Sequence, residues 1–135
     1  MNGDGEDLGS VLYAAYVGQA EQYAIALQMA GEVSAACRGG QALDDRLNQV
    51  VALLHEITER DALLAPAKQQ WERAGRPSSD ALRGVMDRIA MLIRQIQSEL
   101  QAIEQAVIRR RDQLADELDD CNRRYRMQRA YQGKT

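Results

Sequence analysis

The stretch VMDRIAMLIRQIQSELQAIEQAVIRRRDQLADEL, residues 85–118, decides the fold. Its apolar residues recur at steps of three and four, the spacing that places side chains on one face of an α-helix. Within it, an apolar residue stands at every eleventh position, at Val85, Ile96, Val107 and Leu118. An eleven-residue repeat corresponds to about 3.67 residues per turn. The sequence therefore predicts a helix that is nearly straight or weakly right-handed.

This long helix is predicted to cover residues 79–131. Ser78 or Ser79 can cap its N-terminus, and Asp80 is favourable in its first turn. At ~1.5 Å per residue the helix would be roughly 75 Å long. The rest of the chain offers no helix of equal length to cover it. Part of the long helix is therefore expected to project from the bundle, to contact another subunit or to be covered by another protein.

A helix ahead of it is predicted over residues 8–38. Apolar residues recur throughout this segment at steps of three or four, and Tyr16 and Tyr23 stand seven residues apart on the same face. That tyrosine pair suits either core packing or a binding groove. Two glycines at positions 39 and 40 mark the end of the helix. The acidic, Gly-rich residues 1–7 are expected to be flexible.

A further helix is predicted over residues 41–74, with a length of roughly 50 Å. Its apolar residues alternate steps of four and three from Leu43 to Trp71, which is a heptad pattern. Pro66 is expected to kink the last turns. Gly75, in the run AGRPSSD, can supply a left-handed C-terminal cap.

Two polar residues, Asp61 and Lys68, occupy apolar positions of this heptad pattern. One interpretation is that the packing is loose or the helix end is exposed there. The other is that polar core residues select the register of the helices. Because Pro66 lies between the two residues, we favour the first interpretation.

The fold class predicted from these patterns is all-α. The chain of 135 residues suits one domain, and its content of 45% hydrophobic and 27% charged residues is that of a folded protein. Aromatic residues are only 4%, Phe is absent and Pro occurs twice, which argues against a β-sandwich or barrel. We expect an elongated antiparallel helical hairpin or three-helix coiled-coil bundle over residues 8–131, with one very long C-terminal helix and a flexible end at 132–135.

Charge and cysteine content limit the partners and the compartment. The net charge of −3 argues against a general nucleic-acid binder. No apolar run approaches the ~20 residues of a transmembrane helix, so membrane insertion is not expected. The acidic start of the chain is unlike a secretory signal, so a cytoplasmic location is expected, with Cys37 and Cys121 as buried free thiols.

Few residues in the sequence form the patterns of a catalytic or metal-binding site. His55 is the only histidine, and the sequence around it, H-E-x-x-E, differs from the H-E-x-x-H of zinc proteases. One histidine without paired cysteines does not make a usual zinc site. No phosphate-binding glycine loop and no nucleophile elbow is present. We expect no enzyme, no catalytic residue, no metal and no cofactor.

The C-terminal segment RRYRMQRAYQGKT is basic and interleaved with Tyr125, Met127 and Tyr131. A basic C-terminus complements the helix dipole and needs no further role. Two functional alternatives are contact with nucleic acid and docking to an acidic or aromatic-lined partner protein. Five basic residues in an acidic chain favour the protein partner.

Three stretches together resemble the bacterial flagellar export chaperones of the FlgN type, with the FliT type close by. QYAIALQMAGEVSAACRGGQALDDRL at 22–47 is similar to the family's first helix, its small-residue break and the start of its second helix. LLHEITERDALLAP at 53–66 is similar to its charged, Leu-rich second helix. RRRDQLADELDDCNRRYRMQRAYQGK at 109–134 resembles its closing helix, which ends in an Ala-Tyr-Gly-like phrase. Here Gln132 is inserted before the glycine. The resemblance covers nearly the whole chain.

This resemblance implies a small cytoplasmic chaperone without ATPase activity. It implies binding of the helical C-terminal segments of hook-associated proteins, which form the hook–filament junction, and delivery of these proteins to the flagellar type III export gate. For client binding we expect apolar positions of the long and first helices, namely Leu92, Ile96, Leu100, Ile103, Val107, Tyr16 and Tyr23. For docking to the export gate the resemblance points to the basic tail, namely Arg124, Tyr125, Arg126, Arg129 and Tyr131.

Two other functions fit the same patterns. In a structural coiled-coil adaptor without an export client, a second copy would bury the surplus apolar surface as a homodimer or larger homo-oligomer. In a nucleic-acid-associated helical protein, the arginine tail would make the contacts, although the acidic first third of the chain counts against this.

Overall fold

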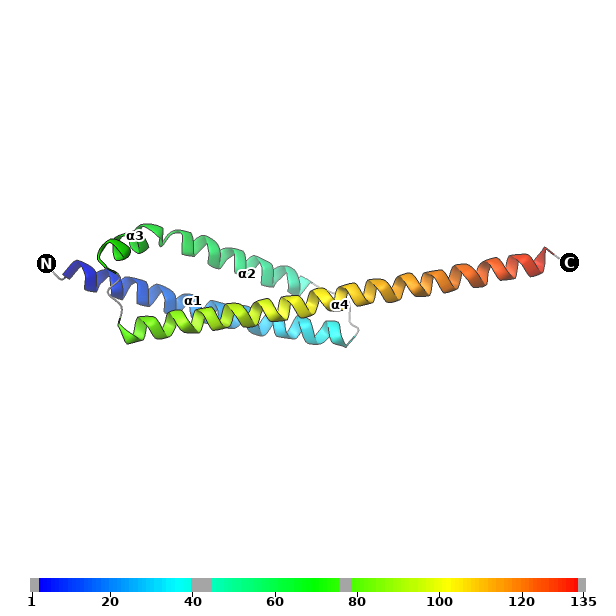
Figure 1. The fold of residues 1–135 in the computed structure, drawn as a ribbon, viewed down its shortest axis with the longest axis horizontal. Helices are drawn as coiled ribbons and strands as arrows, with labels where there is room; N and C mark the ends of the chain where they lie inside the picture. The colour runs from blue at the N-terminus through cyan, green and yellow to red at the C-terminus, as the bar shows by residue number, and fades with distance from the viewer. Residues whose placement is uncertain (1–2, 40–44, 76–78, 134–135) are drawn as a thin grey trace.

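The computed structural model describes residues 3–39, 45–75 and 79–133, which form four helices and no strand (Figure 1). The helices are α1 (Gly3–Arg38), α2 (Asp45–Ala62), α3 (Ala65–Arg73) and α4 (Asp80–Gln132). The predicted all-α fold with one very long C-terminal helix is confirmed. The predicted start of the second helix at residue 41 lies outside the described residues.

Helices α1 and α4 run in the same direction, and α2 with α3 runs back the opposite way along α1 (Figure 1). α1 has extended contacts with each of the other three helices. Within the described ranges, α2 and α4 have no extended contact with each other. The bundle is therefore held together through α1.

From Ala20 onward, the residues that α1 buries are mostly small. Ala26 and Ala30 are fully buried, and Ala20 nearly so. α2 and α4 bury large aliphatic residues instead, such as Ile57 on α2 and Ile96 on α4. Small side chains on the shared helix let the larger ones of its neighbours approach its backbone closely. This complementarity explains how one helix can pack against two others.

A denser cluster closes the end of the bundle where α3 lies. Its buried members are Leu12 and Tyr16 of α1 and Leu82 of α4. The apolar residues that pack against them come from both sides, namely Leu64, Ala67, Trp71, Val85 and Ile89. Burial of these side chains fixes α3 and the start of α4 to the same segment of α1.

The start of α4 is set by two short-range features that the sequence predicts. The Ser79 hydroxyl accepts a hydrogen bond of 3.1 Å from the backbone N–H of Leu82, which satisfies one free donor of the first turn. Gly75, after the end of α3, has a φ of 88°, in the left-handed region that favours glycine. Both predicted caps are confirmed.

Two predicted boundaries differ from the structure. α1 begins at Gly3 rather than at residue 8, and the acidic composition of residues 3–7 is compatible with the first turns of a helix. The predicted helix over 41–74 is two helices, not one. Pro66 has no N–H to donate to Ala62 and its ring crowds that carbonyl, so α2 ends at Ala62 and α3 starts with the proline in its first turn.

The last part of α4, residues 109–132, projects beyond the other helices (Figure 1). We name it the α4 extension. Every residue in it is exposed to solvent. At ~1.5 Å per residue it is roughly 36 Å long. As predicted, part of the long helix therefore lacks cover from the rest of the chain.

A leucine-to-alanine substitution is expected to lower the free energy of unfolding much more near the start of α4 than on its extension. Leu82 is 1% exposed, so Leu82→Ala should lower the free energy of unfolding by about 2–4 kcal/mol through lost burial and a residual cavity. Leu118→Ala is the matched control, because Leu118 is exposed on the extension. Urea unfolding of dilute protein measures both. Equal losses in the two variants would contradict the packing described above.

Candidate functional site

A polar cluster lies where α2 and α3 meet the side of α1. The Gln19 side-chain amide donates a hydrogen bond of 3.0 Å to a carboxylate oxygen of Asp61, and the Lys68 ammonium donates one of 2.8 Å to the same oxygen. The ammonium also lies 5.5 Å from the centroid of the Tyr16 ring, within range of a cation–π interaction. The cluster thus joins the α2–α3 segment to α1 by directional contacts.

The cluster shifts three pKa values. Partial burial raises the pKa of Asp61, but the hydrogen bonds from Lys68 and Gln19 and the charge of Lys68 outweigh this effect and hold it below 3.8. Partial burial lowers the pKa of Lys68, but its contacts with Asp61 and Tyr16 raise it above 10.5. Burial, and then the charge of Asp61, raise the pKa of the Tyr23 hydroxyl. The Asp61–Lys68 pair is therefore ionised over the neutral range.

This geometry corrects the favoured interpretation of Asp61 and Lys68. We interpreted them as marking a loose or exposed part of the heptad pattern. They instead pair with each other across the α2–α3 break and face α1, with about a third of each side chain exposed. The hydrogen bond from Gln19 to Asp61 links this pair to α1. A specific polar contact of this kind is what the register-selecting interpretation requires.

Most residues expected to bind a client lie inside the bundle. Leu92, Ile96 and Ile103 are buried on the face of α4 that packs in the bundle, and Tyr16 is buried in the cluster at the end of the bundle. Leu100 and Tyr23 are partly buried. In this conformation the buried residues are covered by the chain's own helices, whereas Leu100 and Tyr23 are covered only in part. Val107, 40% exposed, is the most accessible member of the set.

The accessible apolar surface lies farther along α4. Val107, Leu114, Leu118, Cys121 and Tyr125 recur at steps of seven, four, three and four, which places them on one side of the helix. Leu114 is 50% exposed and Leu118 63% exposed. We name these five residues the exposed stripe. Sequence reasoning assigned Leu114 and Leu118 no binding role, because periodicity shows that residues share a face but not where the covering helix ends.

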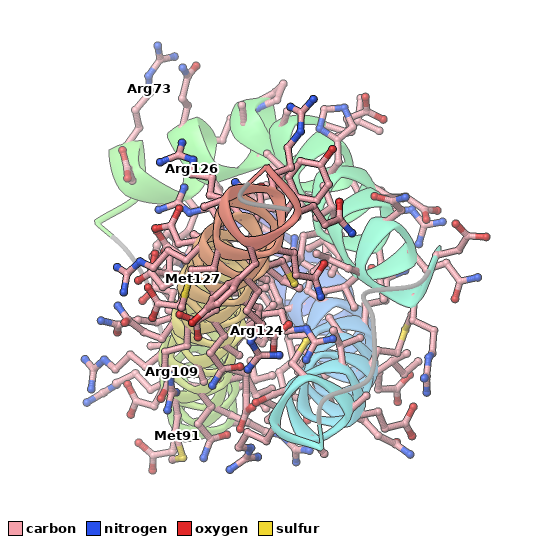
Figure 2. The ribbon with its side chains drawn as sticks, turned by 90° about the vertical axis from the view of Figure 1, so that its right-hand side faces the viewer. Arg73, Met91, Arg109, Arg124, Arg126 and Met127 are labelled. Atoms are coloured by element: carbon pink, nitrogen blue, oxygen red, sulfur yellow. The ribbon has the colours of Figure 1, made fainter. Side chains whose placement is uncertain are left out.

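The residues expected to dock to the export gate are all exposed near the end of α4. They do not share one side. The Arg129 guanidinium lies 5.8 Å from the centroid of the Tyr125 ring, on the side of the exposed stripe. Figure 2 looks along α4 from its C-terminal end and shows Arg124 and Arg126 pointing away from the helix in different directions, with Met127 between them.

Another side of the same segment carries a shallow, open hollow lined by Arg124, Met127, Gln128, Tyr131 and Gln132. We name this set the tail face. Because all its residues belong to one helix, the hollow has no second wall. A partner would have to supply that wall. The tail thus presents an aromatic residue beside a guanidinium on each of two sides, Tyr125 with Arg129 and Tyr131 with Arg124.

Residues of chemical interest elsewhere are dispersed. His55 is exposed on α2, and its Nε2 atom lies 3.0 Å from the Glu59 carboxylate. Across residues 3–39, 45–75 and 79–133, no group of three or more His, Cys, Asp or Glu side chains could hold a metal ion. Cys37 and Cys121 are free thiols. The expectation that both are buried is wrong: Cys37 is only partly buried, and Cys121 is exposed because no helix covers the α4 extension.

Comparison with known proteins identifies no relative of this chain. No protein-family model, curated protein or solved structure matches the chain. In the part of the chain that the structure describes, no helix is both long enough and apolar enough to cross a membrane.

Asp61→Asn is expected to lower the free energy of unfolding by about 1 kcal/mol near neutral pH, a value reduced for partial exposure of the pair. The lowered pKa of Asp61 makes its contribution present above pH 3.8 and lost as the pH falls through the folded-state pKa. The raised pKa of Lys68 makes its contribution present below pH 10.5 and lost as the pH rises through the folded-state pKa. Urea unfolding over a range of pH measures both limits.

The matched control for Asp61→Asn is Glu56→Gln, which removes an exposed ion pair with Arg60 on the same helix. Its effect on the unfolding free energy should be much smaller. Equal losses in the two variants would contradict the role of the cluster, and so would a loss for Asp61→Asn that persists in strong acid.

Proposed function

We propose that this chain is a cytoplasmic chaperone of flagellar type III export. In this proposal it binds the helical C-terminal segment of a hook-associated protein, keeps that protein soluble and unassembled, and delivers it to the export gate. The observation that carries the proposal is the α4 extension, a helix without intramolecular cover that bears an apolar stripe. The resemblance of three stretches to the FlgN type supports the same function.

The client helix is proposed to lie against the exposed stripe. An amphipathic helix binds a partner through apolar residues at steps of three and four, and the stripe offers this spacing from Leu114 to Tyr125. Burial of one leucine side chain contributes about 1.5–3 kcal/mol relative to exposure. Two leucines at the centre of the stripe, Leu114 and Leu118, supply a substantial part of the affinity of such a pairing.

The tail face is proposed to bind the export gate. Its members Arg124, Met127 and Tyr131 stand roughly 100° or more around α4 from Tyr125 of the exposed stripe, so a bound client leaves these three accessible. Aromatic and arginine side chains are enriched among residues that dominate protein interfaces. One helix would in this way carry a client and present a docking surface at the same time.

The alternative is a structural adaptor or homo-oligomer without an export client. In that case the exposed stripe would be covered by another copy of the chain alone, and hook-associated proteins would neither co-purify with the chain nor gain solubility from it. The presence or absence of a client complex separates the two functions.

Co-expression with hook-associated proteins is expected to yield a 1:1 complex. Leu114→Ala with Leu118→Ala should weaken the affinity at least about tenfold, because both side chains lose burial against the client. The matched control is Ile25→Ala with Val51→Ala, two exposed apolar residues on α1 and α2, which should leave it unchanged. Isothermal titration measures the affinity. The proposal fails if no hook-associated protein binds, or if both double variants lose affinity equally.

Arg124→Ala with Tyr131→Ala is expected to separate client binding from delivery. Client affinity should stay unchanged, whereas pull-down of the export-gate component and export of the client should be lost. Arg94→Ala with Tyr13→Ala removes the same residue types from exposed positions outside the tail and serves as the control. Loss of client binding in the tail variant would contradict the division of α4 into two sides.

A further inference from the structure

The α4 extension lacks the packing that usually stabilises a helix in water. Most helical stability in proteins comes from burial of an apolar face rather than from intrinsic propensity. Here Leu114, Leu118 and Tyr125 are each at least half exposed. A helical partner along the exposed stripe would supply the missing burial.

The charges of the extension form three blocks. Arg109, Arg110 and Arg111 form a basic block, and a second basic block follows Cys121. Between them stand five acidic residues and no basic one, namely Asp112, Asp116, Glu117, Asp119 and Asp120. A helix with this order of charges is complementary to a reversed copy of itself when that copy is displaced along the axis.

We propose that the α4 extension pairs antiparallel with the extension of a second copy of this chain. In the register that we infer, Leu118 of one copy lies opposite Val107 of the other, and Tyr125 lies opposite Leu100. Each contact occurs twice because the pairing is two-fold symmetric. Leu118 thus meets Val107, which is exposed, and Tyr125 meets Leu100, which is only partly buried.

Charge selects this register. Beside the stripe, Arg110 of each copy stands next to Glu117 of the other, so the first basic block faces the acidic block twice. The second basic block reaches the segment of the other copy that contains Glu99 and Glu104. The Arg110–Glu117 contact, which occurs twice, is the flanking charge pair that selects the register, and Arg111 of each copy lies opposite Leu114 of the other.

The competing arrangements place like charges together. A seven-residue shift sets Leu114 opposite Leu118, but it places Glu117 beside Glu117 and Arg110 beside Arg124. A parallel pairing in register sets each charge block against its own copy and puts Arg111 opposite Arg111 in the stripe. Like charges side by side at an interface cost free energy, so both arrangements are disfavoured.

This pairing does not depend on the proposed function. It uses the surface on which a client helix is proposed to lie, so a client and a second copy would compete for the exposed stripe. The oligomeric state of the chain alone tests the pairing, whereas co-purification with hook-associated proteins tests the function. Either result can fail without the other.

Disulfide trapping of the full chain tests the register directly. In a Cys37→Ser background, Glu104→Cys places a thiol opposite Cys121 of the other copy, and mild oxidation is expected to give a covalent dimer. Cys37→Ser alone should give none, because Cys121 would face its own copy only in a parallel pair. Arg111→Cys in the same background should give none, because it would face Cys121 only in the shifted register. Trapping in either control, without trapping through Glu104→Cys, would overturn the proposal.

Charge exchange at one flanking pair gives an independent measurement by sedimentation equilibrium. Arg110→Glu should raise the dimer dissociation constant by about tenfold, because symmetry places the change at two sites. Adding Glu117→Arg should restore the original value, since the pair is then reversed rather than broken. In the shifted register Arg110→Glu would instead strengthen the dimer by facing Arg124. That result, or a monomer at all concentrations with no effect of either variant, would overturn the proposal and leave the stripe to a client.

Discussion

Burial against α1 is the interaction on which the rest of the structure depends. α2, α3 and α4 each pack on this helix, and among the described residues they have little packing of their own with one another. Alanines such as Ala26 and Ala30 make this possible, because they leave room for larger residues of two neighbours at once. The polar cluster of Gln19, Asp61 and Lys68 adds direction to this packing.

The separation of α4 into two regions follows from the length of α1. Where α1 and α4 lie side by side, α4 buries Leu92, Ile96 and Ile103. Beyond that point the same apolar pattern continues in solvent. One sequence pattern therefore supplies core packing in the first part of the helix and the surface that we propose for partner binding in the second. The proposed client surface, the tail face and the proposed pairing of two copies all belong to the second part.

Much of the fold is predictable from local sequence. The recurrence of apolar residues from Val85 to Leu118 predicts the long helix, and Ser79 and Gly75 predict the caps around the turn before it. The structure adds what depends on three-dimensional pairing. Periodicity places Leu92 and Leu118 on similar stripes, but only the end of α1 makes one buried and the other exposed. Likewise the seven-residue spacing of Asp61 and Lys68 places them on one face of a helix, whereas the contact of Asp61 with Gln19 depends on how α1 packs beside them.

α4 is one continuous helix across the edge of the bundle. Its first part packs on α1, and its last part has no extended contact with another described helix (Figure 1). Over roughly 36 Å, a tilt of about 5° at the edge of the bundle displaces the tip by roughly 3 Å. A small adjustment in the packing of α4 against the alanine-rich face of α1 would therefore displace Tyr131 more than it displaces the residues at the edge of the bundle.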